Sequence, residues 1–173
     1  MSDVGQIGLV HSNGFWPFVI RVVTNSHWSH NVVFVGDVYD TRGHLINDAV
    51  VSAEGSGVMI MQRGDFPDAV WSDFDLTPTQ QLAIKGFNLD QVGKPYGFWT
   101  DAWIGIAHIF RTRTPKWIEA KLSDQSTWIC SQIADASYSA AGINLFRDDR
   151  PTGSVWPGSL AKIFVRRGWT DKP

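Results

Sequence analysis

The sequence predicts an α+β domain in which the first half of the chain forms an antiparallel sheet and the second half supplies most of the helices. Three observations support this prediction. Runs of β-branched residues separated by Gly, Asp and Asn follow one another between residues 30 and 62. Helix-start signals and helical spacing of apolar residues occur at 77–93 and again at 126–142. No long linker interrupts the 173 residues, of which 43% are hydrophobic, so we expect a single domain over 1–173.

The first two elements are a strand and a helix. The segment "GQIGLVHS" (5–12) predicts a short strand. The segment "FWPFVIRVVTNS" (15–26) predicts a short helix with Pro17 in its first turn. Its apolar residues at helical spacing are Phe18, Val19, Val22 and Val23.

A meander of antiparallel strands should follow. The runs "NVVFVG", "DAVVSAE" and "GVMIMQ" are rich in β-branched residues and are separated by turn-forming ones. This pattern predicts consecutive strands that pair with their neighbours in the chain.

The second half contains the main helix signals. A Thr-Pro start predicts a helix over 77–93, and the strongly apolar segment 96–110 predicts another. The segment 126–142 has Ser126 or Thr127 as N-cap and ends at Gly142. After it, the Pro- and Gly-rich stretch "RPTGSVWPGSLAK" predicts a loop that leads to a short terminal segment, "AKIFVRRGW".

The composition argues against several classes of function. A net charge of −2 and a pI near 6.2 provide no basic surface for nucleic acid, so we expect none as a partner. No apolar run approaches the roughly 20 residues of a membrane span, and "MSDVGQIGLV" does not resemble a signal peptide. We therefore expect a protein that is cytoplasmic as synthesised.

The chain has no motif for a metal or another cofactor, and we expect neither. A single cysteine, Cys130, excludes an internal disulfide and a multi-cysteine metal site. His27 and His30 form an H-x-x-H pair, but the sequence supplies no further zinc ligands near them. Phosphate-loop, dinucleotide-binding and G-x-S-x-G motifs are absent from the sequence.

Cys130 is the main candidate for chemistry. It falls in the first turn of the helix predicted at 126–142, where the helix dipole and unpaired N–H groups favour a thiolate and can hold an oxyanion. The alternative is an inert buried cysteine, since free cysteines are among the most buried residue types.

A nucleophilic thiol needs a base, usually His, and that His needs a third group to orient it. His30 directly precedes the strand "NVVFV" and is the stronger candidate for the base, whereas His27 lies in the loop before the strand. In "VVSAEGSG" the side chains of Ser52 and Glu54 share one face of a strand. Glu54 is our preferred third group, with Ser52 and His44 as alternatives.

Several segments, in order, resemble one family. They are "GQIGLV", "TNSHWSHNVVFVGD", "VVSAEGSGV", "GKPYGFW", "WICSQIADASYSAAGINL" and "SVWPGSLAK". Together they resemble the circularly permuted branch of the NlpC-type papain-like superfamily, in which the His strand precedes the Cys helix. Relatives of that branch include bacterial amidases and peptidases and the lecithin retinol acyltransferase group.

The resemblance implies an antiparallel sheet packed against the helix that carries the cysteine, with Cys130 as nucleophile and His30 as general base. Where the family often has a Glu, this chain has Ser52, with Glu54 two residues later. The resemblance also implies a cleft-wall role for Tyr96. We expect Tyr96, Ser52, Ser131 and Trp128 to contact the substrate.

The expected activity is that of a cysteine peptidase or amidase that cleaves an amide bond, with peptidoglycan peptides as the substrate class that the resemblance implies. One alternative is a lipid-directed thioesterase or acyltransferase, in which the apolar residues of 98–110 border an acyl pocket or contact a bilayer. The other is a non-catalytic structural subunit that retains the fold. Either an enzyme or a subunit of this kind could belong to a larger assembly, such as a phage tail or a secreted complex, that delivers it.

Overall fold

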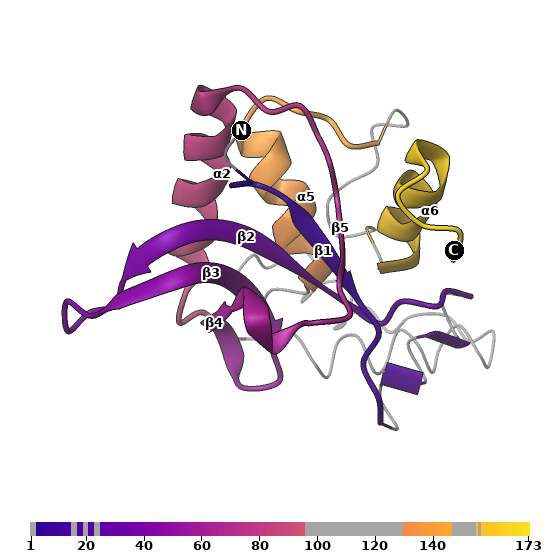
Figure 1. Ribbon diagram of the computed structural model, residues 1–173, viewed down its shortest axis with the longest axis horizontal. Coiled ribbons are helices and arrows are strands. Elements are labelled where there is room, and N and C mark those ends of the chain that lie inside the picture. The colour runs from indigo at the N-terminus through magenta and orange to yellow at the C-terminus, as the bar shows by residue number, and fades with distance from the viewer. Residues whose placement is uncertain are drawn as a thin grey trace, which may run out of the picture.

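The computed structural model describes residues 3–14, 17–18, 21–22, 25–95, 130–146, 155 and 157–173. Within them the chain is α+β, with a five-stranded antiparallel sheet of order β4-β3-β2-β1-β5 and three helices (Figure 1). The strands are β1 (Ile7–Val10), β2 (His30–Tyr39), β3 (Leu45–Glu54), β4 (Gly57–Gln62) and β5 (Val70–Trp71). The helices are α2 (Pro78–Gln91), α5 (Cys130–Ala140) and α6 (Pro157–Arg167), with a 3-10 turn η1 (Arg63–Asp65).

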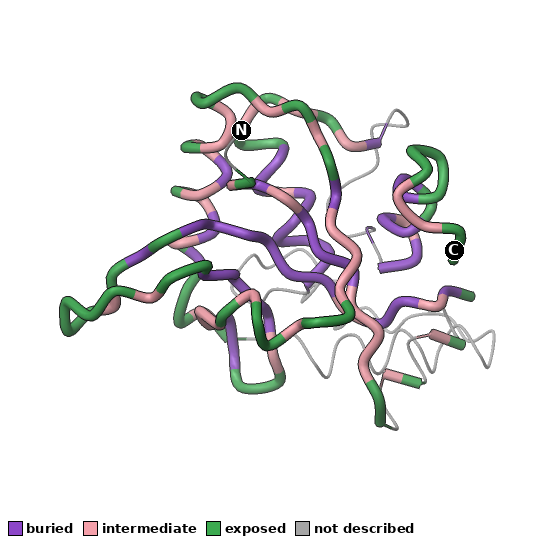
Figure 2. The backbone as a smooth tube through the Cα atoms, in the orientation of Figure 1, coloured by how far each residue is buried: buried purple, intermediate pink, exposed green. Residues whose placement is uncertain are grey.

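The predicted meander is confirmed. Strands β2, β3 and β4 pair in chain order, and their residues alternate between the two faces of the sheet because the side-chain period of a strand is two. The register pairs Val32 with Ser52 and Val33 with Val51. The central part of the meander is buried, whereas the far end of the β2–β3 hairpin is exposed (Figure 2).

The three helices share one apolar core on one side of the sheet. Val33 of β2 belongs to the same buried cluster as Ile84 of α2, Tyr138 of α5 and Phe164 of α6. The opposite side of the sheet has a smaller buried cluster formed by Val32, Phe34 and Val50, against which Met61, Phe66 and Trp71 pack. The sheet is therefore covered on both faces near its centre, and α5 is held against β2 and β3.

Helix α2 begins where the sequence predicts. The Thr77 hydroxyl accepts from the Gln80 N–H at 3.3 Å, and the Gln80 side chain accepts in return from the Thr77 N–H at 3.0 Å. This is a capping box, and Pro78 occupies the first helical position, where a missing N–H leaves no bond unmade.

Other predictions are wrong or incomplete. The expected loop 150–162 is helical from Pro157 onward, because α6 runs through the Pro-Gly pair and buries Leu160, Ile163 and Phe164. The two-residue strand β5 has no signal in the sequence, and it forms by pairing with β1.

In the segment 15–26, Pro17, Phe18, Arg21 and Val22 are helical. Phe18 and Val22, the described residues of the expected apolar face, are each more than half exposed, so this face is not buried there. The helix predicted at 96–110 lies outside the described residues. Among the helices that are described, none has the length and apolar character needed to cross a bilayer.

Candidate active site

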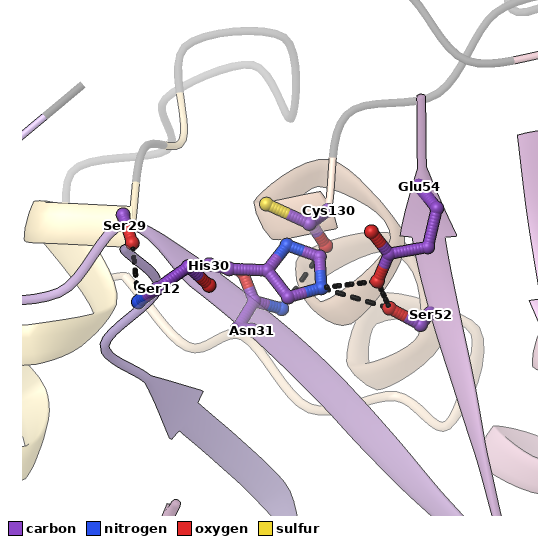
Figure 3. Close-up of polar contacts among 7 residues, drawn as sticks. All are labelled: Ser12, Ser29, His30, Asn31, Ser52, Glu54 and Cys130. Carbon is purple, nitrogen blue, oxygen red and sulfur yellow. Dashed lines mark hydrogen bonds and ion pairs between the residues drawn. The ribbon is translucent and has the colours of Figure 1, made fainter. Parts of the chain in front are cut away.

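His30 is the first residue of β2, the central strand of the sheet. Because β2 and β3 are antiparallel and Val32 pairs with Ser52, the same register puts His30 opposite Glu54. The residue before His30 is also fixed, since the Ser29 hydroxyl accepts from the Ser12 N–H at 3.0 Å (Figure 3). The backbone that carries the imidazole is therefore fixed on both sides, by the Ser29 hydrogen bond and by the pairing of β2 with β3.

Two polar groups, from Ser52 and Glu54, meet at one nitrogen of the His30 ring. Its Nε2 lies 2.8 Å from the Ser52 Oγ and 3.2 Å from the Glu54 Oε1. The Ser52 hydroxyl donates to the Glu54 Oε1 at 2.6 Å. Because Ser52 gives its proton to Glu54, its oxygen must accept from His30, so the network assigns a proton to Nε2. The second ring nitrogen is left for another partner.

Cys130 is the first residue of α5 as the structure describes it. Its side chain lies beside the His30 imidazole (Figure 3). Cys130 is only 4% exposed and packs among apolar residues that include Ala53 and Val58. The strand start and the helix start therefore bring a thiol and an imidazole together across 100 positions of sequence (130 − 30).

The charges of the site support one another. Burial lowers the pKa of His30, but its interactions with Cys130 and with the Glu54 carboxylate outweigh burial and raise this pKa to about 10. The hydrogen bond from His30 lowers the pKa of Glu54 from its ordinary 4.5 to about 2, against the opposing effect of burial. Near neutral pH this arrangement favours the imidazolium form of His30 beside the carboxylate form of Glu54.

The structure distinguishes the three candidates for the group that orients His30. Glu54 and Ser52 both contact His30, whereas His44 lies at the exposed end of the β2–β3 hairpin with its Nδ1 3.2 Å from the Asp40 Oδ2. The structure therefore does not bring His44 to His30. His27 also lies apart from this network: its ring stacks on that of His11, with centroids 4.3 Å apart.

The residues expected to contact substrate have mixed outcomes. Ser52 is 1% exposed, and its hydroxyl contacts both His30 and Glu54. Ser131 is fully buried and donates to the Val155 carbonyl at 2.5 Å, so the structure does not place its side chain on an exposed surface. Tyr96 and Trp128 lie outside the described residues.

Sequence reasoning missed Asn31, the residue after His30. It is 1% exposed, and its Nδ2 donates to the Cys130 carbonyl at 3.1 Å. A signal was available: in "HNVVFV" an amide occupies a position that strand alternation directs to the same face as the buried Val33. A polar residue at such a position needs a partner inside the protein.

The described side chains include no cluster of three or more His, Cys, Asp or Glu that a metal ion would require. The arrangement of Cys130, His30, Ser52 and Glu54 instead matches the requirements of nucleophilic catalysis: a thiol, a base within reach, and a group that orients the base. A comparison with models of known protein families finds none that matches the chain. A comparison with curated protein sequences likewise finds no similar protein.

Proposed function

We propose that this protein is a cysteine hydrolase that cleaves an amide bond by acyl transfer and has a circularly permuted NlpC-type papain-like fold. The observation that carries the proposal is the position of His30, whose Nε2 contacts Ser52 and Glu54 and whose ring lies beside the Cys130 side chain (Figure 3). A cysteine with a purely structural role has no need of an imidazole oriented in this way.

The order of the elements supports the permuted fold. The strand that carries His30 precedes the helix that carries Cys130, and α5 packs against the sheet near that strand. These features agree with the segments that resemble the permuted branch of the NlpC-type superfamily.

In the proposed reaction, the Cys130 thiolate attacks the carbonyl carbon of the amide and forms a tetrahedral intermediate. The backbone N–H of Cys130 helps to stabilise its oxyanion, as first-turn N–H groups have no partner within their helix. The C–N bond then breaks, and the His30 imidazolium transfers its proton to the leaving amine. The product of this half-reaction is a thioester on Cys130.

Water completes the cycle. Neutral His30 removes a proton from a water molecule, whose oxygen attacks the thioester. The acid product leaves, and the thiolate and imidazolium are restored, so one amide and one water yield one acid and one amine. General acid–base assistance of this kind is worth about 10²–10⁴-fold in rate.

The substrate class that we propose is a peptidoglycan peptide, on the basis of the family resemblance. The test is to incubate the wild-type protein, Cys130→Ala and His44→Ala with peptidoglycan sacculi and to identify released fragments by mass spectrometry. We expect fragments from wild type and from His44→Ala but not from Cys130→Ala. His44 is the matched control because it too pairs with a carboxylate, at an exposed position.

A second measurement separates the chemistry from the substrate. A thiolate paired with His30 should react rapidly with iodoacetamide near neutral pH, and the rate should fall in His30→Ala. Rapid reaction without release of fragments would reject peptidoglycan but keep the nucleophile. A Cys130 that reacts only after denaturation would refute the hydrolase and favour the structural-subunit alternative.

A further inference from the structure

Asn31 joins the two elements that form the candidate active site. It is the second residue of β2, directly after His30, and its Nδ2 donates to the backbone carbonyl of Cys130 at 3.1 Å (Figure 3). Within a helix that carbonyl also serves the N–H four residues later, and its second lone pair remains for the Asn31 amide. The bond therefore connects the residue next to the imidazole with the residue that bears the thiol.

Apolar contacts also hold α5 against the meander. Ile133 of α5 belongs to a buried cluster with Val35, Val51 and Ala53 of the sheet. Apolar contacts are non-directional, so they hold a helix on a sheet without specifying its exact height or rotation. A hydrogen bond has a narrow range of length and angle, so it does specify them.

The Asn31 side chain is poorly suited to a purely stabilising role. Its Oδ1 is buried and has no hydrogen-bond partner in the described part of the structure. An unpaired buried acceptor destabilises a fold, and an apolar side chain of the same shape would avoid that loss. The retention of an amide here is explained if its single bond to Cys130 is needed.

We propose that Asn31 is a positioning residue, which holds the first residue of α5 against β2 so that the Cys130 thiol and the His30 ring meet in the reactive geometry. This inference rests on the proposed function, because it assumes that Cys130 is a nucleophile. Asn31 does not contact the reacting atoms; it acts through the backbone of Cys130. Misplacement of a reacting group by about 1 Å can reduce a rate by about 10²-fold.

The chain offers a matched control. Asn88 of α2 is also fully buried, its Nδ2 donates to a backbone carbonyl, that of Ile84, at 2.8 Å, and its Oδ1 is also unpartnered among the described residues. The difference is that the Asn88 bond lies within its own helix and joins no two elements. Asn31→Leu and Asn88→Leu therefore make the same chemical change with and without the link to Cys130.

The experiment measures the rate of Cys130 alkylation by iodoacetamide across pH, together with the melting temperature, in the full chain. We expect Asn31→Leu to keep a cooperative thermal transition, to lower the rate at pH 7 by about tenfold or more, and to move the acid limb of the pH–rate profile to higher pH. Asn88→Leu should leave the rate and the profile unchanged. Asn31→Ala, which inserts no bulky apolar group, should reproduce the effect of Asn31→Leu.

Each other outcome overturns the proposal. A folded Asn31→Leu or Asn31→Ala with the wild-type rate and profile would show that the bond does not position the thiol. An equal loss of rate in Asn88→Leu would attribute the effect to general loosening of the core. Failure of both Asn31 variants to fold would assign Asn31 to stability instead. Slow alkylation of the wild-type protein would refute the proposed function itself and is distinguishable from these results.

Discussion

The replacement of Glu54 by Gln tests the electrostatic design of the site. Glutamine has nearly the same shape and can still accept from the Ser52 hydroxyl, which lies 2.6 Å from the carboxylate in the wild type. The change therefore removes the negative charge beside His30 with little change in packing. We expect the pKa of His30 to fall from about 10, because Glu54 is one of the groups that raise it.

The magnitude follows from the geometry. The Glu54 Oε1 lies 3.2 Å from the His30 Nε2, but the Glu54 side chain is 37% exposed, so solvent screens part of the attraction. Hydrogen bonds to charged groups contribute about 1.5–3 kcal/mol, and exposed ion pairs about 0.2–1 kcal/mol. A value of about 1–2 kcal/mol lies between these limits and corresponds to about a 5- to 30-fold lower proton affinity of His30.

The assay is an NMR titration of the His30 ring in wild type and Glu54→Gln, with the ring signals assigned from His30→Gln. Cys130 should be left unmodified, since its interaction with the ring also raises the pKa of His30. A lower midpoint in Glu54→Gln supports the reasoning. An unchanged midpoint would refute it, because it would mean that the carboxylate does not act on the imidazole.

Three further predictions concern the same site and the turn beside it. Ser52→Ala should lower the rate of Cys130 alkylation severalfold with little loss of stability, since the hydroxyl links the ring to Glu54. The check is to measure alkylation rates of Ser52→Ala and of the control His44→Ala, which should match wild type. The folded pKa of His30, about 10, exceeds its ordinary 6.5, so the stability from His30 is fully present below pH 6.5 and is lost as the pH rises toward 10. The folded pKa of Glu54, about 2, is below 4.5, so the stability from Glu54 is present above pH 4.5 and is lost as the pH falls toward 2. The stabilisation from the His30–Glu54 pair should therefore be greatest between pH 4.5 and 6.5. The measurement is the melting temperature across pH, in which this stabilisation should be absent from a His30→Gln/Glu54→Gln double variant. Gly57→Ala should reduce the free energy of unfolding by about 1–3 kcal/mol in urea titrations, because the residue has a positive φ and its Cβ would lie 2.9 Å from the Lys94 carbonyl oxygen; an unaltered midpoint would contradict that estimate.

Much of the sheet follows from local rules. Runs of β-branched residues predict the strands of the meander, and the turn residues between them predict their order. The two-residue period of strand side chains places Ser52 and Glu54 on one face of β3, which the bond between them confirms. Helix α2 was predictable because a capping box needs only residues that are close in sequence.

The errors occurred where local signals and tertiary contacts disagree. Pro157 and Gly158 predict a loop, but Pro is well tolerated at a helix start, and the burial of Leu160 and Phe164 makes α6 favourable. His44 was a reasonable candidate for the third group because the sequence alone does not show how far the end of the β2–β3 hairpin lies from His30. Once the strands pair, His44 lies at the exposed hairpin end with Asp40 as its partner.

The sequence by itself determined the strand that begins at His30, the common face of Ser52 and Glu54, and the identity of Cys130 as the sole thiol, because each depends on composition or on a period of two. Only the tertiary structure decided which groups meet. The bond between the Asn31 amide and the Cys130 carbonyl spans 99 positions, and no local pattern encodes it. Such a contact depends on how α5 packs against the sheet, which is determined by the apolar core as a whole. The same packing puts the imidazole between a thiol from one element and a carboxylate from another.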